Sequence, residues 1–215
     1  MPVTASPGGV RVERVVTSGV FELDGGSWEV DNNVWVVGDD TECLVVDAAH
    51  DAAAIIEAVH GRRVVALVCT HGHNDHVNAV VDLVAATGAT AYLHPDDWVL
   101  WDQTQDDPPG AELHDGQVFT VGDVDLTVIH TPGHAPGACC LHAPALEVLF
   151  SGDTLFQGGP GATGRSYSDF PTIIESLRTR VLPLPEETVV LTGHGDSTSI
   201  GAEGPHLEEW IARGH

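Results

Sequence analysis

Four side chains able to bind metal lie within six positions of one stretch of the chain. Thr70–Val77 reads T-H-G-H-N-D-H-V, and its candidate ligands are His71, His73, Asp75 and His76. His71 and His73 are two positions apart, so on an extended backbone they project to the same side and can bind one cation. Asp75 and His76 point elsewhere and could bind a second. Imidazole nitrogens combined with a carboxylate oxygen suit zinc, iron or manganese better than calcium.

The elements expected to position these ligands flank them on both sides. Residues 64–69 form a continuous apolar run, V-V-A-L-V-C, which is typical of a buried strand. Residues 77–86 have the apolar spacing of a helix, and Gly88 would end it. The ligands would then lie on a strand-to-helix loop held by rigid elements. The alternative is a polar loop whose histidines cap a helix or bond to the backbone, and the density of ligands on this loop favours the metal site.

Three more candidate groups each follow an apolar strand. The strands expected over residues 42–46, 147–151 and 188–192 lead into Asp47, Asp153 and His194. A carboxylate that comes directly after a buried strand and a glycine, as Asp153 does, is well placed to bridge two metal ions. Asp47 could instead cap the N-terminus of the helix expected over residues 52–59, since aspartate is a common N-cap.

Together these motifs resemble the metallo-β-lactamase superfamily. H-x-H-x-D-H at 71–76, T-P-G-H-A-P-G-A at 131–138, G-D-T-L-F at 152–156 and G-H-G at 193–195 occur in the family's order. The resemblance implies an α/β fold, the αββα sandwich, in which two mixed sheets are flanked by helices and the metals lie at one edge between the sheets. The length suits a single domain over residues 1–215. Residues 1–9 contain two Pro and two Gly, and we expect a loose start there.

The resemblance also implies a role for each matching residue. One ion would be bound by His71, His73 and His134 and a second by Asp75, His76 and His194, with Asp153 shared between them and Asp47 orienting the metal loop. Two divalent ions, zinc first with iron or manganese as alternatives, would hold a hydroxide nucleophile, because a bound cation lowers the pKa of water toward ~7. Asp75 would orient that hydroxide or shuttle its proton, which makes it the candidate catalytic residue. The chain has no G-x-S-x-G nucleophile elbow.

Residues 152–177 resemble the glyoxalase II branch of the superfamily. G-D-T-L-F is followed there by a Gly-rich loop with an arginine and by a helix that ends in a Ser-Leu pair. The tail from 193 to 203, G-H-G followed by T-x-I-G-x-E, is similar to the short bacterial form. Those enzymes hydrolyse thioesters of low-molecular-weight thiols. The resemblance therefore implies a metal-dependent hydrolase with a small-molecule thioester substrate.

The chain departs from the long glyoxalase II enzymes in the parts that recognise glutathione. Those enzymes have a C-terminal helical domain with basic residues, whereas residues 205–215 here allow only one short helix. The loop G-A-T-G-R-S-Y-S-D-F is longer than the G-R-T-D version of many relatives and looks like that of actinobacterial hydrolases associated with mycothiol, a sugar thiol. Arg165, Ser166 and Tyr167 are the candidate substrate contacts. The alternative for this loop is a purely structural glycine turn.

Two other activities stay open. A persulfide dioxygenase, which also resembles this branch, would use one iron held by His71, His134 and Asp153. A β-lactamase or another metallo-hydrolase is the second alternative, although lactamases of the superfamily usually lack or replace one of the ligands found here. A binding module without catalysis is disfavoured because the whole ligand set is present.

Composition restricts the partners. The chain has 32 acidic residues against 8 arginines and no lysine, a formal charge of −24, which repels nucleic acid and anionic membranes. No apolar run approaches the ~20 residues of a bilayer span, and the first thirty residues lack the pattern of a secretion signal. We therefore expect a cytoplasmic protein that binds neither nucleic acid nor membrane.

Its four cysteines, Cys43, Cys69, Cys139 and Cys140, are expected to be reduced core residues, although the last two, being adjacent, could be redox-active.

Some further histidine and aromatic residues are expected to be structural. His60, His94 and His130 fall outside the ligand spacing. Residues 98–110 are a candidate flap beside the site, in which Trp98 or Trp101 could contact substrate. Four other aromatic residues are expected in the core rather than on a dimer surface: Phe21, Trp28, Trp35 and Trp210.

Overall fold

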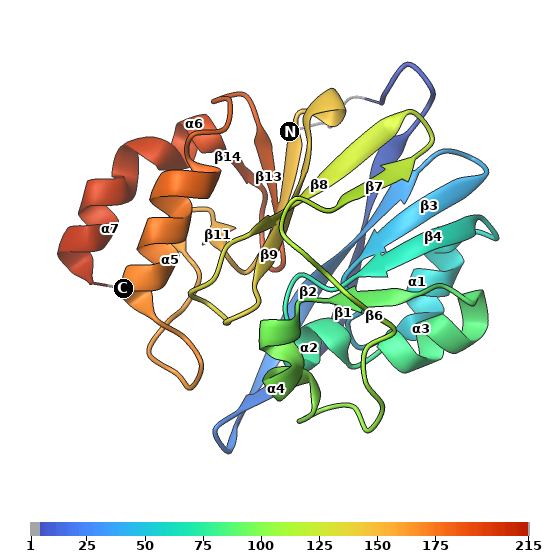
Figure 1. Cartoon of the computed structure of the whole chain (residues 1–215), viewed down its shortest axis with the longest axis horizontal. Coiled ribbons are helices and arrows are strands. Elements are labelled where there is room, and N and C mark those ends of the chain that lie inside the picture. The colour runs from blue at the N-terminus through green and yellow to red at the C-terminus, as the bar shows by residue number, and fades with distance from the viewer. Residues whose placement is uncertain (1–4, 215) are drawn as a thin grey trace.

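Two six-stranded sheets pack face to face in the computed structural model, which describes residues 5–214 (Figure 1). The first sheet has the order β1-β2-β3-β4-β5-β6, with bounds Arg11–Leu23, Gly26–Gly38, Glu42–Val46, Arg63–Val68, Ala91–Leu93 and Ala111–Glu112. The second has the order β14-β13-β10-β9-β8-β7, with bounds Thr198–Ser199, Val189–Thr192, Val148–Gly152, Cys139–Ala143, Val124–His130 and Val118–Val121. A separate two-stranded ribbon joins β11 and β12, Leu155–Phe156 and Gly159–Pro160.

Helices cover the outer face of each sheet (Figure 1). Those that follow strands of the first sheet are α1, α2, α3 and α4, with bounds Ala52–Val59, Asn74–Val77, Val80–Thr87 and Trp98–Trp101. Those beside the second are α5, α6 and α7, with bounds Phe170–Ser176, Ile200–Glu203 and Leu207–Arg213. Short turns are 3₁₀ at Pro95–Asp97, Pro144–Leu146 and Gly204–His206, and π at Leu177–Val181.

The apolar core is divided into layers that match this arrangement. One buried cluster, which includes Trp35, Leu126 and Phe150, fills the space between the two sheets. A second lies between the first sheet and its helices, and a third, around Trp210, lies between the second sheet and its helices. The layer order is therefore helix, sheet, sheet, helix, and the predicted αββα sandwich is confirmed.

A long hairpin at the start of the chain differs from the sequence prediction. Strands β1 and β2 pair without a break from Arg11 opposite Gly38 to Leu23 opposite Gly26. The apolar residues of the sequence alone predict two short separate strands, at 28–30 and 33–37, and this prediction is wrong because the pairing with β1 continues through the polar residues between them. Asp24 and Gly25 both have positive φ, as a two-residue hairpin turn requires. The far end of the hairpin projects beyond the sheet (Figure 1).

The predicted single helix over residues 77–86 is two helices. Helix α2 begins inside the metal motif at Asn74, and α3 begins at Val80 after a short break. The break lets the first turn direct Asp75 and His76 inward while α3 packs its own apolar side against the sheet. The predicted end at Gly88 is confirmed, because this residue is the left-handed C-cap of α3.

Residues 5–9 are better ordered than a loose start would be. The Ser6 hydroxyl donates to Asp123 Oδ1 at 2.5 Å, and the Gly8 amide donates to Oδ2 of the same carboxylate at 2.8 Å. The side chain of Ser6 is buried. The prediction therefore fails for residues 5–9, and its remaining part, residues 1–4, lies outside the described residues.

Whether the aromatic residues are buried as predicted depends on where they lie in the fold. Trp35 and Trp210 are buried as expected, but Trp28 is 41% exposed and Phe21 half-buried, because both lie on the projecting hairpin. Trp101 is buried and its indole N–H donates to the Asp107 carbonyl at 2.7 Å, so it is a packing residue. Trp98 is partly buried and packs against the helix-covered side of the first sheet.

The four cysteines are all buried and unpaired, as predicted. Burial raises the pKa of Cys140 to about 11 and that of Cys139 well above its ordinary value, so neither thiol of the adjacent pair has thiolate character at neutral pH. Among the described residues, no helix has the length and apolar character needed to cross a lipid bilayer.

Candidate metal centre

Four loops that follow strands meet at one edge of the sandwich. His71 to His76 follow β4, His134 lies between β8 and β9, Asp153 follows β10 and His194 follows β13. All seven predicted ligands lie in the groups of close donor atoms that the structure forms there, which are His71–His73–His134, His71–His76–Asp153 and Asp75–His76–His194. His60 does not join them, and His94 and His130 stack on each other elsewhere, with ring centroids 4.0 Å apart.

His71, His73 and His134 form the first half of the cluster. Their ring centroids are 4.8 to 4.9 Å apart. His134 Nε2 lies 3.1 Å from His73 Nδ1, and the other nitrogen of His134 faces the Ala162 carbonyl at 2.9 Å. Because a carbonyl oxygen can only accept, His134 carries its proton on Nδ1 and directs the lone pair of Nε2 into the cluster.

Asp75, His76 and His194 form the second half. His194 Nε2 lies 3.2 Å from His76 Nε2 and 3.3 Å from Asp75 Oδ2. The other nitrogen of each imidazole has a partner: His76 Nδ1 faces Asp47 Oδ2 at 2.9 Å, and His194 Nδ1 faces the Asp31 carbonyl at 2.7 Å. Both rings are thereby held with Nε2 turned inward.

Asp153 lies between the two halves. Its Oδ2 is 3.6 Å from His134 Nε2 and 3.4 Å from His194 Nε2, and its Oδ1 is 3.5 Å from His76 Nε2. One carboxylate therefore reaches donor atoms of both groups. This is the placement expected of a ligand shared by two ions.

The cluster fits divalent metal ions. His71 Nε2, Asp75 Oδ1 and Asp153 Oδ1 are buried and have no hydrogen-bond partner within the described chain. Such atoms cost free energy unless something satisfies them. Ligands about 2.0–2.1 Å from a tetrahedral zinc are about 3.3 Å apart, close to the separations found here. Cations at the centre of the ligand groups would satisfy His71 Nε2 and Asp153 Oδ1.

The two halves differ in their electrostatics. Burial lowers the pKa of His71 well below its ordinary value and that of His73 to about 3, so both imidazoles are neutral. Burial would also lower the pKa of His76, but Asp75, Asp153 and Asp47 together raise it to about 9. Asp75 keeps a pKa of about 2 despite burial, because His76 and His194 stabilise its charge. The second half therefore contains charged side chains, whereas His71 and His73 of the first half are neutral.

Asp47 fixes the start of the loop that carries His71 to His76. It has a positive φ of 64°, and its Oδ1 accepts the Thr70 amide at 2.7 Å. Its Oδ2 accepts the Thr70 hydroxyl and faces His76 Nδ1, both at 2.9 Å. The N-cap of α1 is Asp51, whose side chain accepts the Ala54 amide, so the alternative N-cap role for Asp47 is wrong.

Asp97 is a second supporting carboxylate, and sequence reasoning missed it. It is fully buried, and its two oxygens accept the amides of Gly72 at 2.8 Å and Gly137 at 2.5 Å. These glycines belong to the loops of His71 and His134, so one side chain joins two ligand loops. Burial raises the pKa of Asp97 to about 7, against the opposing effect of the two amide donors. No periodicity marks this position, which lies in a P-D-D turn.

A cavity of about 230 Å³ lies over the cluster. It is lined by Phe21, Leu23, Trp28 and Val30 of the hairpin, Ala162, Arg165, Ser166 and Ser168 of the loop after β12, and His73, Asp75, His134, Asp153 and His194 of the cluster. The Arg165 guanidinium lies 3.8 Å from the Trp28 ring centroid, and the Ser166 amide donates to Asp24 at 3.1 Å. These contacts join the hairpin to the loop across the cavity. Tyr167 is exposed and is not among the lining residues.

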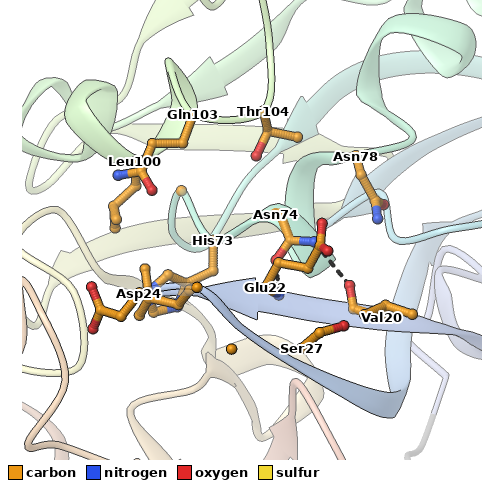
Figure 2. A pocket seen from close by; sticks show the side chains of 14 residues that line it. Val20, Glu22, Asp24, Ser27, His73, Asn74, Asn78, Leu100, Gln103 and Thr104 are labelled. Carbon is orange, nitrogen blue, oxygen red and sulfur yellow. Dashed lines mark hydrogen bonds between the residues drawn. The ribbon is translucent and has the colours of Figure 1, made fainter.

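A larger cavity of about 620 Å³ lies between the hairpin and the residues around α4 (Figure 2). It shares His73 and Leu23 with the first cavity. Glu22, Asp24 and Asn74 line it, and Asn74 donates to the Val20 carbonyl at 2.8 Å. Arginine is absent from its described lining.

Comparison with known proteins settles the family. The model of the metallo-beta-lactamase superfamily matches residues 28–194. The chain belongs to this superfamily. With that membership and the His/Asp groups described above, the protein is a metal-binding member of a hydrolase superfamily.

The similar proteins include a hydroxyacylglutathione hydrolase and a metallo-beta-lactamase. Hydroxyacylglutathione hydrolase GloC of Haemophilus influenzae is 29% identical over 181 residues, which cover 77% of this chain and 85% of that protein. The crystal structure of BLEG-1 B3 metallo-beta-lactamase matches with a TM-score of 0.76 and 31% identity, and the match covers 89% of this chain and 98% of that one. The crystal structure of TTHA1623 in a di-iron-bound form matches with a TM-score of 0.67 and 28% identity, and the match covers 95% of this chain and 96% of that one.

Replacing Asp97 by asparagine tests its role in joining the loops. The new side-chain amide can accept only one of the two glycine N–H groups and turns a donor toward the other. We expect Asp97→Asn to lower the free energy of unfolding by about 1–3 kcal/mol, because one buried amide loses its acceptor. Urea unfolding of metal-stripped protein measures this. The exposed neighbour provides the control: Asp96→Asn should change stability by less than about 0.5 kcal/mol. Equal unfolding midpoints for both variants would show that Asp97 does not stabilise the loops.

Proposed function

We propose that the protein hydrolyses thioesters of a low-molecular-weight thiol at a two-ion centre. The observation that carries the proposal is the pair of ligand groups, His71–His73–His134 and Asp75–His76–His194, with Asp153 between them beneath a cavity. A centre with one iron would need only His71, His134 and Asp153, and would leave the second group of inward-facing donors without a purpose. Two zinc ions are the proposed occupants, with iron or manganese as alternatives, since the donor set accepts all three.

Divalent ions bound here would lower the pKa of a bound water toward ~7 and polarise a carbonyl group. The residues of the chain would complete the site. Asp75 turns Oδ2 toward His76 and His194, while its Oδ1 is unpartnered and its side chain lines the cavity. This oxygen is free to accept a hydrogen bond from the attacking water and so to orient it toward the carbonyl carbon. A thiolate is a good leaving group, so no additional acid is needed at sulfur.

The cavity supports a short acyl group as the part of the substrate bound nearest the cluster. Its walls are apolar where the hairpin lies over it, at Phe21, Leu23 and Val30. Arg165 and Ser166 supply polar groups on the opposite side, where they would bind substrate oxygens, and Tyr167 would reach a larger substrate from outside. Similarity to a hydroxyacylglutathione hydrolase supports a hydroxyacyl thioester.

The thiol itself is proposed to be an uncharged sugar thiol such as mycothiol rather than glutathione. Arg165 is the one arginine among the described residues lining the two cavities, and the larger cavity carries Glu22 and Asp24. Such a surface would repel the carboxylates of glutathione, whereas the hydroxyl groups of a sugar could donate to it. A reduced intracellular thiol as substrate agrees with the cytoplasmic location that we propose.

Asp75→Asn tests the hydrolase directly. The amide carries no charge and offers a donor as well as an acceptor, so it orients the water less well, and we expect hydrolysis of S-lactoylglutathione, or of the matching mycothiol ester, to fall about 10²–10⁴-fold in kcat. Asp82→Asn, at an exposed carboxylate of α3, is the matched control and should keep parental activity. Parental kcat in Asp75→Asn would contradict the assigned role. Absence of thioester cleavage in the parent, together with oxygen uptake on a persulfide, would replace the hydrolase by the dioxygenase.

Arg165→Gln tests the substrate contact. Loss of the guanidinium removes a binding group that does not take part in bond breaking, so KM should rise about 10-fold with kcat little changed. Arg180→Gln is the control, because Arg180 pairs with Asp115 and does not line either cavity. Steady-state kinetics on the same thioester measure both. An unchanged KM in Arg165→Gln would favour the purely structural turn.

A further inference from the structure

A directed chain of hydrogen bonds leads from an exposed asparagine to the Asp75 carboxylate. We propose that Asn32 and His50 are positioning residues that hold Asp75 in the orientation needed to bind the second ion. Neither residue belongs to the metal motifs. The inference rests on the proposed function in one respect, the assignment of Asp75 as a ligand.

Asn32 makes the direct contact. It lies on β2 and is fully buried. Its Nδ2 donates to the Asp75 backbone carbonyl at 2.9 Å and to Asp75 Oδ2 at 3.1 Å. This is the oxygen that faces His194, 3.3 Å away. One side-chain amide thus fixes both the backbone of Asp75 and the rotation of its carboxylate.

His50 holds Asn32 in turn. His50 Nε2 lies 2.9 Å from Asn32 Oδ1, and His50 Nδ1 lies 2.9 Å from Asn78 Nδ2. The His50 backbone amide donates to Asn78 Oδ1 at 2.6 Å, which fixes the orientation of the Asn78 side chain. Asn78 follows α2 and is exposed, so the chain of contacts runs from solvent to the buried carboxylate.

The chemistry of these groups sets one direction for every bond. Asn32 Oδ1 can only accept, so His50 must carry its proton on Nε2. Asn78 Nδ2 can only donate, so His50 Nδ1 must be unprotonated. A neutral His50 in this single tautomer satisfies both neighbours, and burial lowers the pKa of His50, which favours the neutral form.

The backbone around His50 indicates that its place is tightly specified. His50 has a positive φ of 58°, which is uncommon for a residue with a side chain. Its ring lies against the backbone of β1, where a Cβ on Gly19 would come within 2.2 Å of Nδ1. The loop after β3, strand β1 and strand β2 together hold the imidazole against Asn32.

Such a chain matters because a ligand carboxylate is only as well oriented as its own partners allow. Loss of a partner that orients a metal ligand typically costs 10–100-fold in metal affinity. If these hydrogen bonds act as a unit, removing His50 leaves Asn32 free to rotate, and removing Asn32 leaves His50 without the partner that it orients. The two substitutions should then have the same effect and should not add.

A double-mutant cycle of Asn32→Ala and His50→Leu tests this. The affinity of metal-stripped protein for each of two equivalents of Zn²⁺ is measured by competition with a chromophoric chelator. We expect each single variant to weaken one equivalent about 10–100-fold and leave the other close to the parent. The double variant should be no weaker than Asn32→Ala alone, since residues acting in one network are not additive. His50→Gln, which keeps a donor for Asn32, should recover most of the affinity.

His60→Leu is the matched control. His60 is also a histidine with positive φ, 57°, but it is the exposed C-cap of α1 and lies outside the ligand groups. It should bind both equivalents as the parent does. Additive losses in the double variant, or parental affinity in His50→Leu, would overturn the inference while leaving the proposed function intact. If the parent cleaves no thioester but the variants still bind Zn²⁺ more weakly than it does, the proposed function is contradicted and the positioning role is supported.

Discussion

The need to compensate buried imidazoles and carboxylates at one point governs the rest of the structure. Seven side chains that prefer water are drawn together, and several of their donor atoms have no partner within the described chain. Burial of such groups is costly unless a charge of opposite sign or a metal ion satisfies them. A metal-binding superfamily member meets this cost with its ions, and the protein must keep the ligands in place before the ions arrive.

Preorganisation comes from contacts on the far side of each ligand. His76, His134 and His194 each use the second ring nitrogen to bind a carboxylate or a carbonyl, so the nitrogen that faces the cluster is fixed. Asp47 and Asp97 fix the loops themselves through backbone amides. The two sheets supply the frame because apolar strands end at the same edge, and their ends place all the loops within reach of one another.

Sequence alone could identify the candidate ligands and one of their supports, Asp47, but not the other supports. The ligands occur in dense motifs after apolar strands, and Asp47 follows a strand in the same way, so all of them leave a local signal. Asp97, Asn32 and His50 leave none, because the partners that define their roles are 18 or more residues away along the chain. The prediction that Trp28 is buried was wrong for a related reason. The sequence does not show that the hairpin carrying this residue projects past the sheet.

Metal content is the measurement that tests the two-ion centre most directly. The metal in protein purified without added metal would be measured by inductively coupled plasma mass spectrometry, and the protein concentration by quantitative amino-acid analysis. We expect two equivalents of divalent metal per chain, zinc foremost, held by the two ligand groups that share Asp153. A single equivalent that stays at one when zinc, iron or manganese is supplied in excess would contradict the two-ion account.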